Sequence, residues 1–350
     1  MKELLALYGM QAEETKIEPF GSGLINSTWL VTHDAQQYIL QKINKAVFKN
    51  PPGIDENIHA INDYLITHKS HYRFVTPLPS LRGETLVHYE MEHYRLFKFI
   101  HSKAYLSVPD PAIAFEAAKQ FGMFTKFLSG FDASVLQETI PHFHDIDLRQ
   151  NQFLQAIQQG NRERVLRSEQ LINSLLQYKN IVEEYDGIRQ NSSFRKRVTH
   201  HDTKISNVLF DENNKGICII DLDTVMPGYF ISDVGDMMRT YLSPVSEEET
   251  NFNLIETRDD YFKAIVEGYL GEMKSELSKE ELNAFVYSGK FLIYMQALRF
   301  LADYLNNDVY YGARYELHNF NRAQNQLRLL ECLVDKEDYY NAIVREFHVN

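Results

Sequence analysis

The spacing of apolar residues divides the chain into a strand-rich first part and a helical remainder. Residues 24–31 and 38–43 are rich in β-branched and aromatic side chains, and the polar stretch 33–37 between them predicts a hairpin. Apolar residues then recur at helical spacing over 54–65, after a proline and glycine break at 50–53. Further strands are expected over 74–78, 85–89 and 93–100.

Helical periodicity dominates after about residue 100. Pro109, Asp110 and Pro111 open the first of these helices. Short strands are expected near 198–200, 207–210 and 216–222. The pattern predicts an α+β fold of two lobes, with a small antiparallel-sheet N-lobe over residues 1–100 and a larger, mainly helical C-lobe over 101–350. The other helices are expected around 148–158, 162–185, 257–272, 279–305 and 321–333.

Composition narrows the class of protein. A chain of 350 residues is long enough for two hydrophobic cores. Two cysteines, Cys218 and Cys332, cannot form a disulfide framework and suit a reducing cytosol, so a cytoplasmic location is expected. No window approaches the ~20 apolar residues of a membrane span. The net charge of −12 disfavours nucleic-acid and anionic-membrane partners. Composition leaves the oligomeric state open.

The strongest chemical signal is an ordered set of polar residues around a short hairpin. Asp202 is followed by Lys204 and Asn207, and Asp221 and Asp223 come after the strand at 217–220. Because the turn at 211–216 folds the two strands together, Asn207 and the two later acids are expected at one end of the hairpin. The order suits phosphoryl transfer. Asp202 can accept a proton, Lys204 can hold the moving phosphate, and the other three offer oxygen ligands to Mg²⁺.

A purely structural interpretation is that these residues cap turns, which is the commonest role of Asp and Asn. That interpretation accounts neither for the lysine two positions after Asp202 nor for the paired acids Asp221 and Asp223.

The same residues resemble a known catalytic loop. His200-x-Asp202-x-Lys204-x-x-Asn207 is similar to that of the protein-kinase-like superfamily, and Asp221-Leu222-Asp223 resembles its aminoglycoside phosphotransferase and choline kinase branch. The resemblance implies that Asp202 is the catalytic base, that Asn207 and Asp221 bind Mg²⁺, and that His200 packs the loop. The short segment after Asp223 has no room for an activation loop, which favours a small-molecule acceptor.

Two further acids follow the catalytic loop. Asp233 and Asp236 resemble residues that brace the loop in this branch, and they fit equally well as helix caps.

The nucleotide side is expected in the N-lobe. Gly21, Ser22 and Gly23 form a turn whose backbone N–H groups can approach the phosphates of ATP, and Asn26 lies just beyond it. The resemblance also implies a lysine on the third strand. Gln41 and Lys42 both fit that position, but they face opposite sides of a strand. Lys42 is slightly favoured because it carries the charge. Glu56, in the next helix, is its candidate partner, although a helix-start glutamate can simply complement the helix dipole.

The acceptor side is expected in the C-lobe. Arg299 lies in an otherwise apolar helix and needs an acceptor, which is either Asp303 four residues later or an oxygen of the substrate. His144 and Tyr310 belong to two further polar and aromatic clusters in this lobe.

Longer strings resemble a narrower family. Tyr-Ile-Leu-Gln-Lys-Ile-Asn, Glu-Thr-Ile-Pro-x-Phe-His, His-x-Asp-Thr-Lys, Ile-Asp-Leu-Asp-Thr-Val-Met-Pro and Arg-Phe-Leu-x-Asp look like the bacterial N-acetylhexosamine 1-kinases, over nearly the whole chain from Gly21 to Gln326. The resemblance implies transfer of phosphate from ATP, with Mg²⁺, to the anomeric hydroxyl of N-acetylglucosamine or N-acetylgalactosamine. It also implies that Arg299 and Tyr310 bind the sugar. Leu24 stands where the family pattern leads us to expect a histidine, so the sugar and its anomer stay open.

Other functions remain as alternatives. The chain could be a choline, homoserine or aminoglycoside kinase, or a nucleotide-binding pseudokinase without activity. A choline site needs an aromatic cage, and the one tryptophan, Trp29, belongs to the nucleotide hairpin. An inactive protein is disfavoured because the base and the metal ligands are all present.

Overall fold

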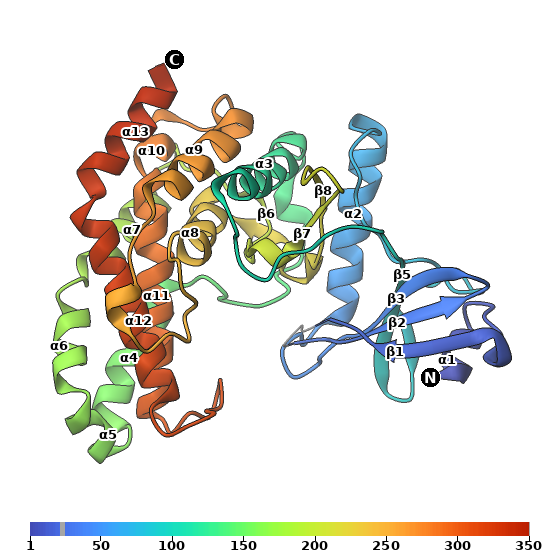
Figure 1. Cartoon of the computed structure of the whole chain (residues 1–350), viewed down its shortest axis with the longest axis horizontal. Coiled ribbons are helices and arrows are strands. Elements are labelled where there is room, and N and C mark those ends of the chain that lie inside the picture. The colour runs from blue at the N-terminus through green and yellow to red at the C-terminus, as the bar shows by residue number, and fades with distance from the viewer. Residues whose placement is uncertain (22–24, 350) are drawn as a thin grey trace.

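The computed structural model describes residues 1–21 and 25–349, and it has the expected α+β architecture of two lobes (Figure 1). Ser22, Gly23 and Leu24 lie outside the described residues. The N-lobe contains an antiparallel five-stranded sheet in the order β1-β2-β3-β5-β4. Its elements are α1 (Lys2–Ala6), β1 (Thr15–Pro19), β2 (Ser27–His33), β3 (Gln36–Lys42), β4 (Val87–Tyr89) and β5 (Glu92–Lys98).

The predicted hairpin of the N-lobe is present. Asp34 and Ala35 connect β2 to β3, and both have positive φ (47° and 61°), as a tight two-residue hairpin turn requires. Two details differ from the prediction. Over 74–78 only Leu78 pairs, as an isolated bridge to Leu96. The strand β1 was not predicted, because its five residues include a single large aliphatic side chain, Ile17.

The C-lobe is mainly helical and holds two small strand pairs. Strand β6 (Arg197–Thr199) pairs with β9 (Met226–Gly228), and β7 (Val208–Phe210) pairs with β8 (Gly216–Ile219). The helices are α3 (Pro111–Phe127), α4 (Ile146–Gln159), α5 (Arg162–Arg167), α6 (Glu169–Leu176), α7 (Asn180–Gln190), α8 (Phe230–Tyr241), α9 (Asp259–Met273), α10 (Lys279–Asn283), α11 (Phe285–Leu305), α12 (His318–Asp335) and α13 (Glu337–Val349).

Two expectations for the C-lobe helices need correction. The long helix predicted over 162–185 is three short helices, α5 to α7, which break at Ser168 and around 177–179. Helix α8 was not predicted, because a glycine and two buried acids interrupt its apolar pattern. Gly235 has a packing reason: a Cβ there would lie 2.2 Å from the carbonyl oxygen of Ser288. The glycine therefore lets α8 approach α11 closely.

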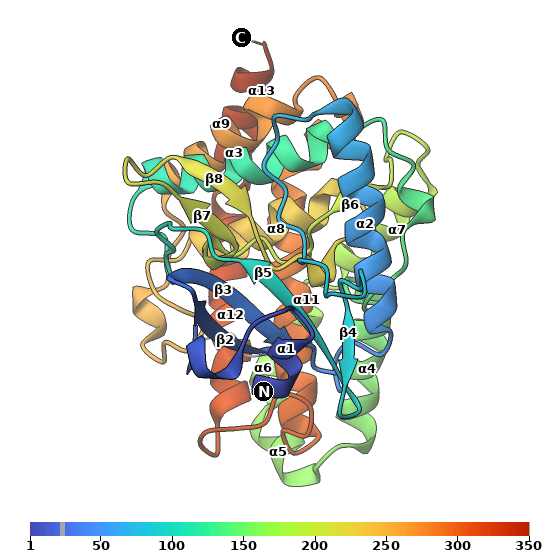
Figure 2. The same cartoon turned by 90° about the vertical axis from the view of Figure 1, so that its right-hand side faces the viewer.

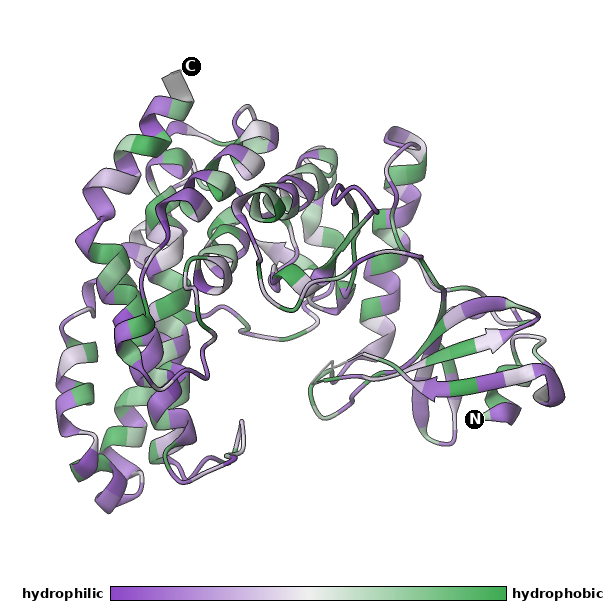
Figure 3. Ribbon diagram, viewed as in Figure 1, coloured by the Kyte–Doolittle hydropathy of each residue, from purple (hydrophilic) through white to green (hydrophobic). Residues whose placement is uncertain are grey.

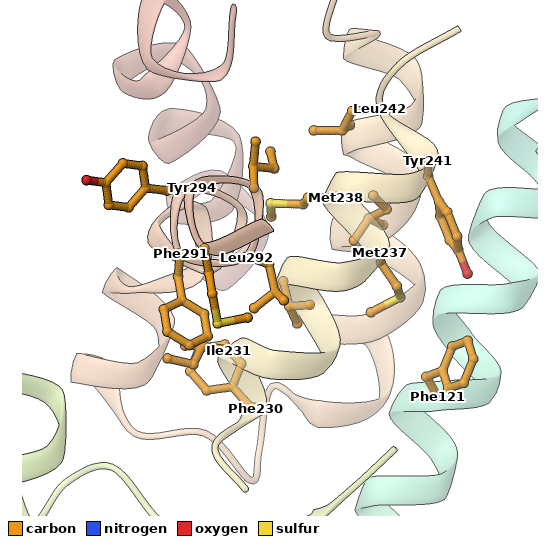
Figure 4. Packing of buried hydrophobic residues seen from close by; sticks show 14 of the residues in the cluster. Phe121, Phe230, Ile231, Met237, Met238, Tyr241, Leu242, Phe291, Leu292 and Tyr294 are labelled. Carbon is orange, nitrogen blue, oxygen red and sulfur yellow. The ribbon is translucent and has the colours of Figure 1, made fainter. Parts of the chain in front are cut away.

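Helix α11 is the central helix of the C-lobe core. Nineteen of its 21 residues are buried, and Figure 4 shows Met238 of α8 and Leu292 of α11 between the two helices. Phe121 of α3 approaches α8 from the other side. Helix α8 is thereby held between two apolar surfaces, which fixes the position of its polar face.

Helix α2 (Pro51–His68) belongs to the C-lobe by its packing. Its apolar residues, coloured along the helix in Figure 3, join the large core cluster of the C-lobe rather than the small core under the sheet. Figures 1 and 2 show α2 running beside the C-lobe. The sheet and α1 enclose their own cluster of buried residues: Leu4, Leu5, Met10, Val31, Leu40, Val87 and Leu96. The domain boundary at residue 100 stays a prediction.

Asn57 fixes α2 to the C-lobe through polar contacts. Its Nδ2 donates to the carbonyl oxygens of Gln137 (2.9 Å) and Val225 (3.0 Å), and its Oδ1 accepts from the N–H of Gln137 at 2.8 Å. The side chain is 2% exposed. Within residues 1–21 and 25–349, no helix is both long and apolar enough to cross a membrane.

Asn57→Ala tests this attachment. The substitution leaves the buried carbonyl group of Val225, and the partly buried carbonyl and N–H groups of Gln137, without their partner, so the free energy of unfolding should fall by about 2 kcal/mol. Urea denaturation followed by circular dichroism measures it. The neighbouring exposed residue supplies the control, because Glu56→Ala should change the free energy by less than about 0.5 kcal/mol. Equal midpoints for the two variants would contradict the assignment.

Candidate active site

The catalytic loop is bound to two carboxylates of α8. Asp233 accepts hydrogen bonds from the backbone N–H groups of His200 (3.0 Å) and His201 (2.7 Å). Asp236 accepts from the N–H of Thr203 at 2.7 Å. Burial raises the pKa of Asp233 to about 6, so the group is ionised at neutral pH and above. Of the two roles open for these acids, the contacts therefore favour bracing of the loop.

His200 is a packing residue of this loop. Its ring is fully buried, and its Nε2 lies 3.0 Å from the carbonyl oxygen of Ile220. The N–H of Asp202 donates to Nδ1 at 3.3 Å, and Phe121 contacts the ring edge-on. Nδ1 is thus an acceptor, and Nε2 lies where it can donate to the carbonyl oxygen.

Asp202 is positioned by Lys204 and Asn207. Its Oδ2 accepts from Lys204 Nζ at 2.7 Å and from Asn207 Nδ2 at 3.0 Å. Burial alone would raise the pKa of Asp202, but the charge of Lys204 and these hydrogen bonds outweigh burial, so the pKa lies below its ordinary value. Its Oδ1 accepts no hydrogen bond within the described part of the chain. An ionised carboxylate with one unoccupied oxygen can receive a hydroxyl proton.

The hairpin brings Asn207 and Asp221 together, as predicted from their spacing. The N–H of Ile220, the residue before Asp221, donates to the carbonyl oxygen of Asn207 at 2.9 Å. Asp221 adopts a left-handed conformation (φ 61°), which is uncommon for a residue other than glycine and points to a functional constraint.

These two residues suit a divalent cation. The carboxylate of Asp221 forms no hydrogen bond or ion pair among the described residues. Burial, followed by the charges of Asp223 and Asp202, raises its pKa to about 6. Asn207 donates through Nδ2, which leaves its Oδ1 without a donor in the described structure. A cation held by Asn207 and Asp221 would offset this repulsion between acids, and oxygen ligands are those that Mg²⁺ prefers.

Asp223, which we predicted as a metal ligand, contacts the N-lobe. Its Oδ1 lies 2.5 Å from Nη2 of Arg95 on β5, and its Oδ2 accepts from Asn26 Nδ2 at 2.7 Å. Asn26 is in turn fixed by the N–H of Asn44, which donates to its Oδ1 at 3.0 Å. These contacts join the two lobes. Asn26 and Asp223 thus take part in the contact between the lobes. Oδ1 of Asp223 is buried, with an ion pair to Arg95 but no hydrogen bond among the described residues, so its role as a metal ligand stays a prediction.

The strand register settles which side of β3 faces this contact. Gln41 pairs with Arg95, and its Oε1 accepts from Arg95 Nε (3.2 Å) and Nη2 (3.0 Å). Lys42 pairs with Tyr94 and lies on the opposite face of the sheet. Glu56 is exposed on α2 and forms no ion pair in the described structure. The candidate pair of Lys42 and Glu56 is therefore not formed in the described structure.

Sequence reasoning missed Arg95. The residue is 2% exposed in the middle of an apolar strand. A buried arginine needs an acceptor, and applying that rule to the stretch Tyr94-Arg95-Leu96 would have marked it as a candidate.

On the acceptor side, a cavity of about 450 Å³ lies between α4, α11 and the segment that follows α11. Arg299 donates to Gln296 Oε1 at 3.1 Å, and its guanidinium lies 5.4 Å from the ring of Tyr311 and 5.8 Å from that of Tyr310. Asp303 is not its partner, because this carboxylate accepts the backbone N–H groups that follow α11. The cavity is lined by Arg149, Gln152, Gln155, Ala156, Gln159, Arg299, Ala302, Asp303, Asn306, Tyr310 and Tyr311.

Arg149 gives the cavity a second guanidinium. It donates to Gln152 Oε1 (3.0 Å) and to the carbonyl oxygen of His142 (2.9 Å). Burial and then the nearby charge of Arg299 lower the pKa of Arg149. Neither arginine forms an ion pair with a carboxylate in the described part of the chain, although most buried guanidinium groups are paired.

His144 lies between the catalytic loop and this cavity. Its ring stacks on Phe143 with the centroids 4.5 Å apart and lies 5.2 Å from the ring of His201. Burial lowers the pKa of His144, and its neighbours His201 and Arg299 lower it further. Its Nδ1 is buried without a hydrogen-bond partner among the described residues. A polar atom in that state is available to a ligand.

His201 should make stability depend on pH. Burial, and then the charge of His200, lowers its pKa to about 3, whereas the unfolded chain binds a proton below about pH 6.5. Stability contributed by the neutral ring is therefore lost as the pH falls from about 6.5 towards 3, and this loss reaches about 2 kcal/mol at pH 5.

The expected result is that His201→Asn flattens the fall in the free energy of unfolding between pH 7.5 and pH 5, as measured by urea denaturation. Asparagine suits the positive φ of this position (67°). His142→Asn is the matched control, because His142 is exposed and also has a positive φ (57°). If both variants keep the wild-type slope, His201 is not the titrating group.

Comparison with known proteins identifies the family and the fold. Residues 16–269 match the model of the phosphotransferase enzyme family (APH). A spectinomycin phosphotransferase, APH(9)-Ia, bound to ADP and spectinomycin, has a TM-score of 0.60 at 14% identity, with 96% of this chain and 97% of that chain covered. A microcompartment-associated aminopropanol kinase has a TM-score of 0.57 at 15% identity, with 97% of each chain covered.

Choline kinase from Cryptosporidium parvum Iowa II also has a TM-score of 0.57, at 12% identity, with 97% of this chain and 95% of that chain covered. These likenesses show the two-lobed kinase-like fold. The family match spans well over half of the chain and includes the catalytic loop and both acids that follow the hairpin. The chain is a phosphotransferase that uses a hydroxyl acceptor, and it belongs to the phosphotransferase enzyme family.

Proposed function

We propose that the protein transfers the γ-phosphate of ATP to the anomeric hydroxyl of an N-acetylhexosamine and so forms a sugar 1-phosphate. The observation that carries the proposal is the acceptor cavity, where the guanidinium groups of Arg149 and Arg299 have no carboxylate partner among the described residues and the one carboxylate of the lining, Asp303, accepts backbone N–H groups. The family supports phosphoryl transfer to a hydroxyl. The sugar itself rests on the resemblance of the sequence strings and on the chemistry of this cavity.

The nucleotide would lie between the sheet and the catalytic loop. Gly21, with φ 77°, opens the turn whose backbone would cover the phosphates, and the predicted contacts of Ser22 and Gly23 lie outside the described residues. Asn207 and Asp221 would hold Mg²⁺, which when bound neutralises charge on the β- and γ-phosphates. The adenine is expected beside the segment after β5, where the ring edge of Phe99 meets Phe20.

Asp202 and Lys204 divide the chemistry between them. The unoccupied Oδ1 of Asp202 would accept a hydrogen bond from the anomeric hydroxyl, orient its oxygen towards the phosphate and then take its proton. Lys204 is held 2.7 Å from Asp202 and adds a positive charge next to the transferring group. The pKa of Asp202 lies below its ordinary value, so the carboxylate is ionised at the pH at which the enzyme works.

The charges of the acceptor cavity support a neutral or anionic acceptor over a cationic one. Choline, ethanolamine-like amines and aminoglycosides are cations, and each would face the positive charges of Arg149 and Arg299. A neutral sugar offers hydroxyl and acetamido oxygens to the same donors. Homoserine is the second candidate, because its carboxylate would also suit two unpaired guanidinium groups.

Asp202→Asn should lower kcat by at least about 10²-fold, because the base and the orienting acceptor are lost together. The assay measures ADP release with N-acetylglucosamine, N-acetylgalactosamine, homoserine and choline, and phosphorus NMR locates the phosphate on the product. Glu212→Gln, in the exposed β7–β8 turn, is the control and should keep wild-type kcat. Turnover of Asp202→Asn close to wild type, with an intact fold, would overturn the proposal.

Arg299→Met should raise KM for the sugar by about 10- to 100-fold, because a charge-assisted hydrogen bond contributes about 1.5–3 kcal/mol. KM for ATP should stay within about twofold of wild type, since the residue lies on the acceptor side. Arg162→Met removes an exposed arginine at the start of α5 and serves as the control. A rise in KM for ATP instead of the sugar would place Arg299 on the wrong side of the site.

A further inference from the structure

The described structure places no lysine of β3 and no glutamate of α2 at the contact between the lobes. Gln41, which occupies the relevant face of β3, is neutral, and Glu56 is exposed. Phosphoryl transfer nevertheless benefits from a fixed positive charge between the nucleotide-binding sheet and the metal-binding segment. Strand β5 brings a cation, Arg95, to that place, where it is the cross-strand neighbour of Gln41 on β3.

We propose that Arg95 is a positioning residue for the reaction, and that it replaces on β5 the charge that β3 lacks. Its side chain is 2% exposed, and its Nη2 lies 2.5 Å from Oδ1 of Asp223, which is 1% exposed. Both charges are thus removed from water and depend on each other. Taking away one partner of such a pair leaves an uncompensated buried charge, which is costly.

Gln41 sets the direction of the guanidinium. Its Oε1 accepts from both Nε and Nη2 of Arg95, and its Nε2 lies 3.4 Å from Thr28 Oγ1 on the neighbouring strand. The amide is therefore oriented by β2 and in turn orients Arg95. A lysine at position 41 of β3 would reach the space that the Arg95 guanidinium occupies, because positions 41 and 95 are cross-strand partners on neighbouring strands.

The contact also bears on Asp221. Asp223 belongs to the short turn Leu222–Thr224, which starts from the left-handed residue Asp221. Arg95 holds one carboxylate oxygen of Asp223 and Asn26 holds the other. With Asp223 fixed from the N-lobe, the turn cannot rotate without breaking both contacts, and the orientation of the Asp221 carboxylate follows from the position of the sheet.

The test compares Arg95→Gln, Arg95→Lys, and the exchange variant Gln41→Lys with Arg95→Gln. Lys98→Gln is the matched control, because it removes an exposed cation from the same strand. Two quantities are measured for each: kcat and KM with ATP and the sugar, and the rise in melting temperature that Mg²⁺ adds to ATP relative to ATP with EDTA. The kinetic constants rest on the proposed function, whereas the Mg²⁺-dependent rise in melting temperature does not.

Arg95→Gln should lower kcat by about 100-fold, the effect typical of losing one preorganised charge at such a site, and should abolish most of the Mg²⁺-dependent rise. Arg95→Lys and the exchange variant should each have a kcat at least about tenfold higher than that of Arg95→Gln. Both should also regain much of the Mg²⁺-dependent rise in melting temperature. Lys98→Gln should match the wild type.

A merely structural role gives a different result. In that case Arg95→Gln lowers the melting temperature of the free protein but keeps kcat and the Mg²⁺-dependent rise within about twofold of wild type, which overturns the proposal. If Arg95→Gln does not fold, the exchange variant decides, and a folded exchange variant without any Mg²⁺-dependent rise overturns the proposal as well. If the wild type phosphorylates no N-acetylhexosamine, the proposed function fails, and the Mg²⁺-dependent rise still tests Arg95.

Discussion

The site depends on the hydrogen bonds by which two carboxylates of α8 hold the backbone of the catalytic loop. His201 and Asp221 both adopt left-handed conformations, which cost energy for residues with a Cβ and persist only where the surroundings impose them. Asp233 and Asp236 provide that constraint from one side. Thr224 adds to it by donating through Oγ1 to the carbonyl oxygen of His200 at 2.7 Å. The loop is consequently ordered before any ligand binds.

The conformation of the catalytic loop depends in turn on the packing of α8. A helix that places two carboxylates under a loop must itself be immobile, and Gly235 allows α8 to lie against α11 at a distance that a side chain would prevent. Tyr241, the last residue of α8, also donates to the carbonyl oxygen of Thr203 at 2.7 Å. The core packing therefore fixes α8, α8 fixes the catalytic loop, and the loop fixes the position of the Asp202 carboxylate.

The sequence predicted those parts of the site that are local in the chain. Asp202, Lys204 and Asn207 lie within six residues, and one hairpin joins them to Asp221, so spacing alone was enough. The choices that the sequence left open are long-range ones. The face that Lys42 presents depends on strand register, and the partner of Asp223 comes from β5, which no local pattern identifies. Helical spacing offered Asp303 as one of two possible partners of Arg299, but the backbone after α11 uses that carboxylate.

The contacts of α2 and of Asp223 determine which elements can move relative to the C-lobe. Helix α2 is joined to the C-lobe by its apolar face and by Asn57, so it does not travel with the sheet as an independent element. Separation of the sheet from the catalytic loop must instead break the contacts of Asp223 with Arg95 and Asn26. Because the Arg95–Asp223 pair is buried, opening would expose two charges whose attraction is strongest in the dry, closed state. Water entering the gap would weaken that attraction while hydrating each charge. Closure of the lobes and order of the metal-binding segment are therefore coupled through one ion pair.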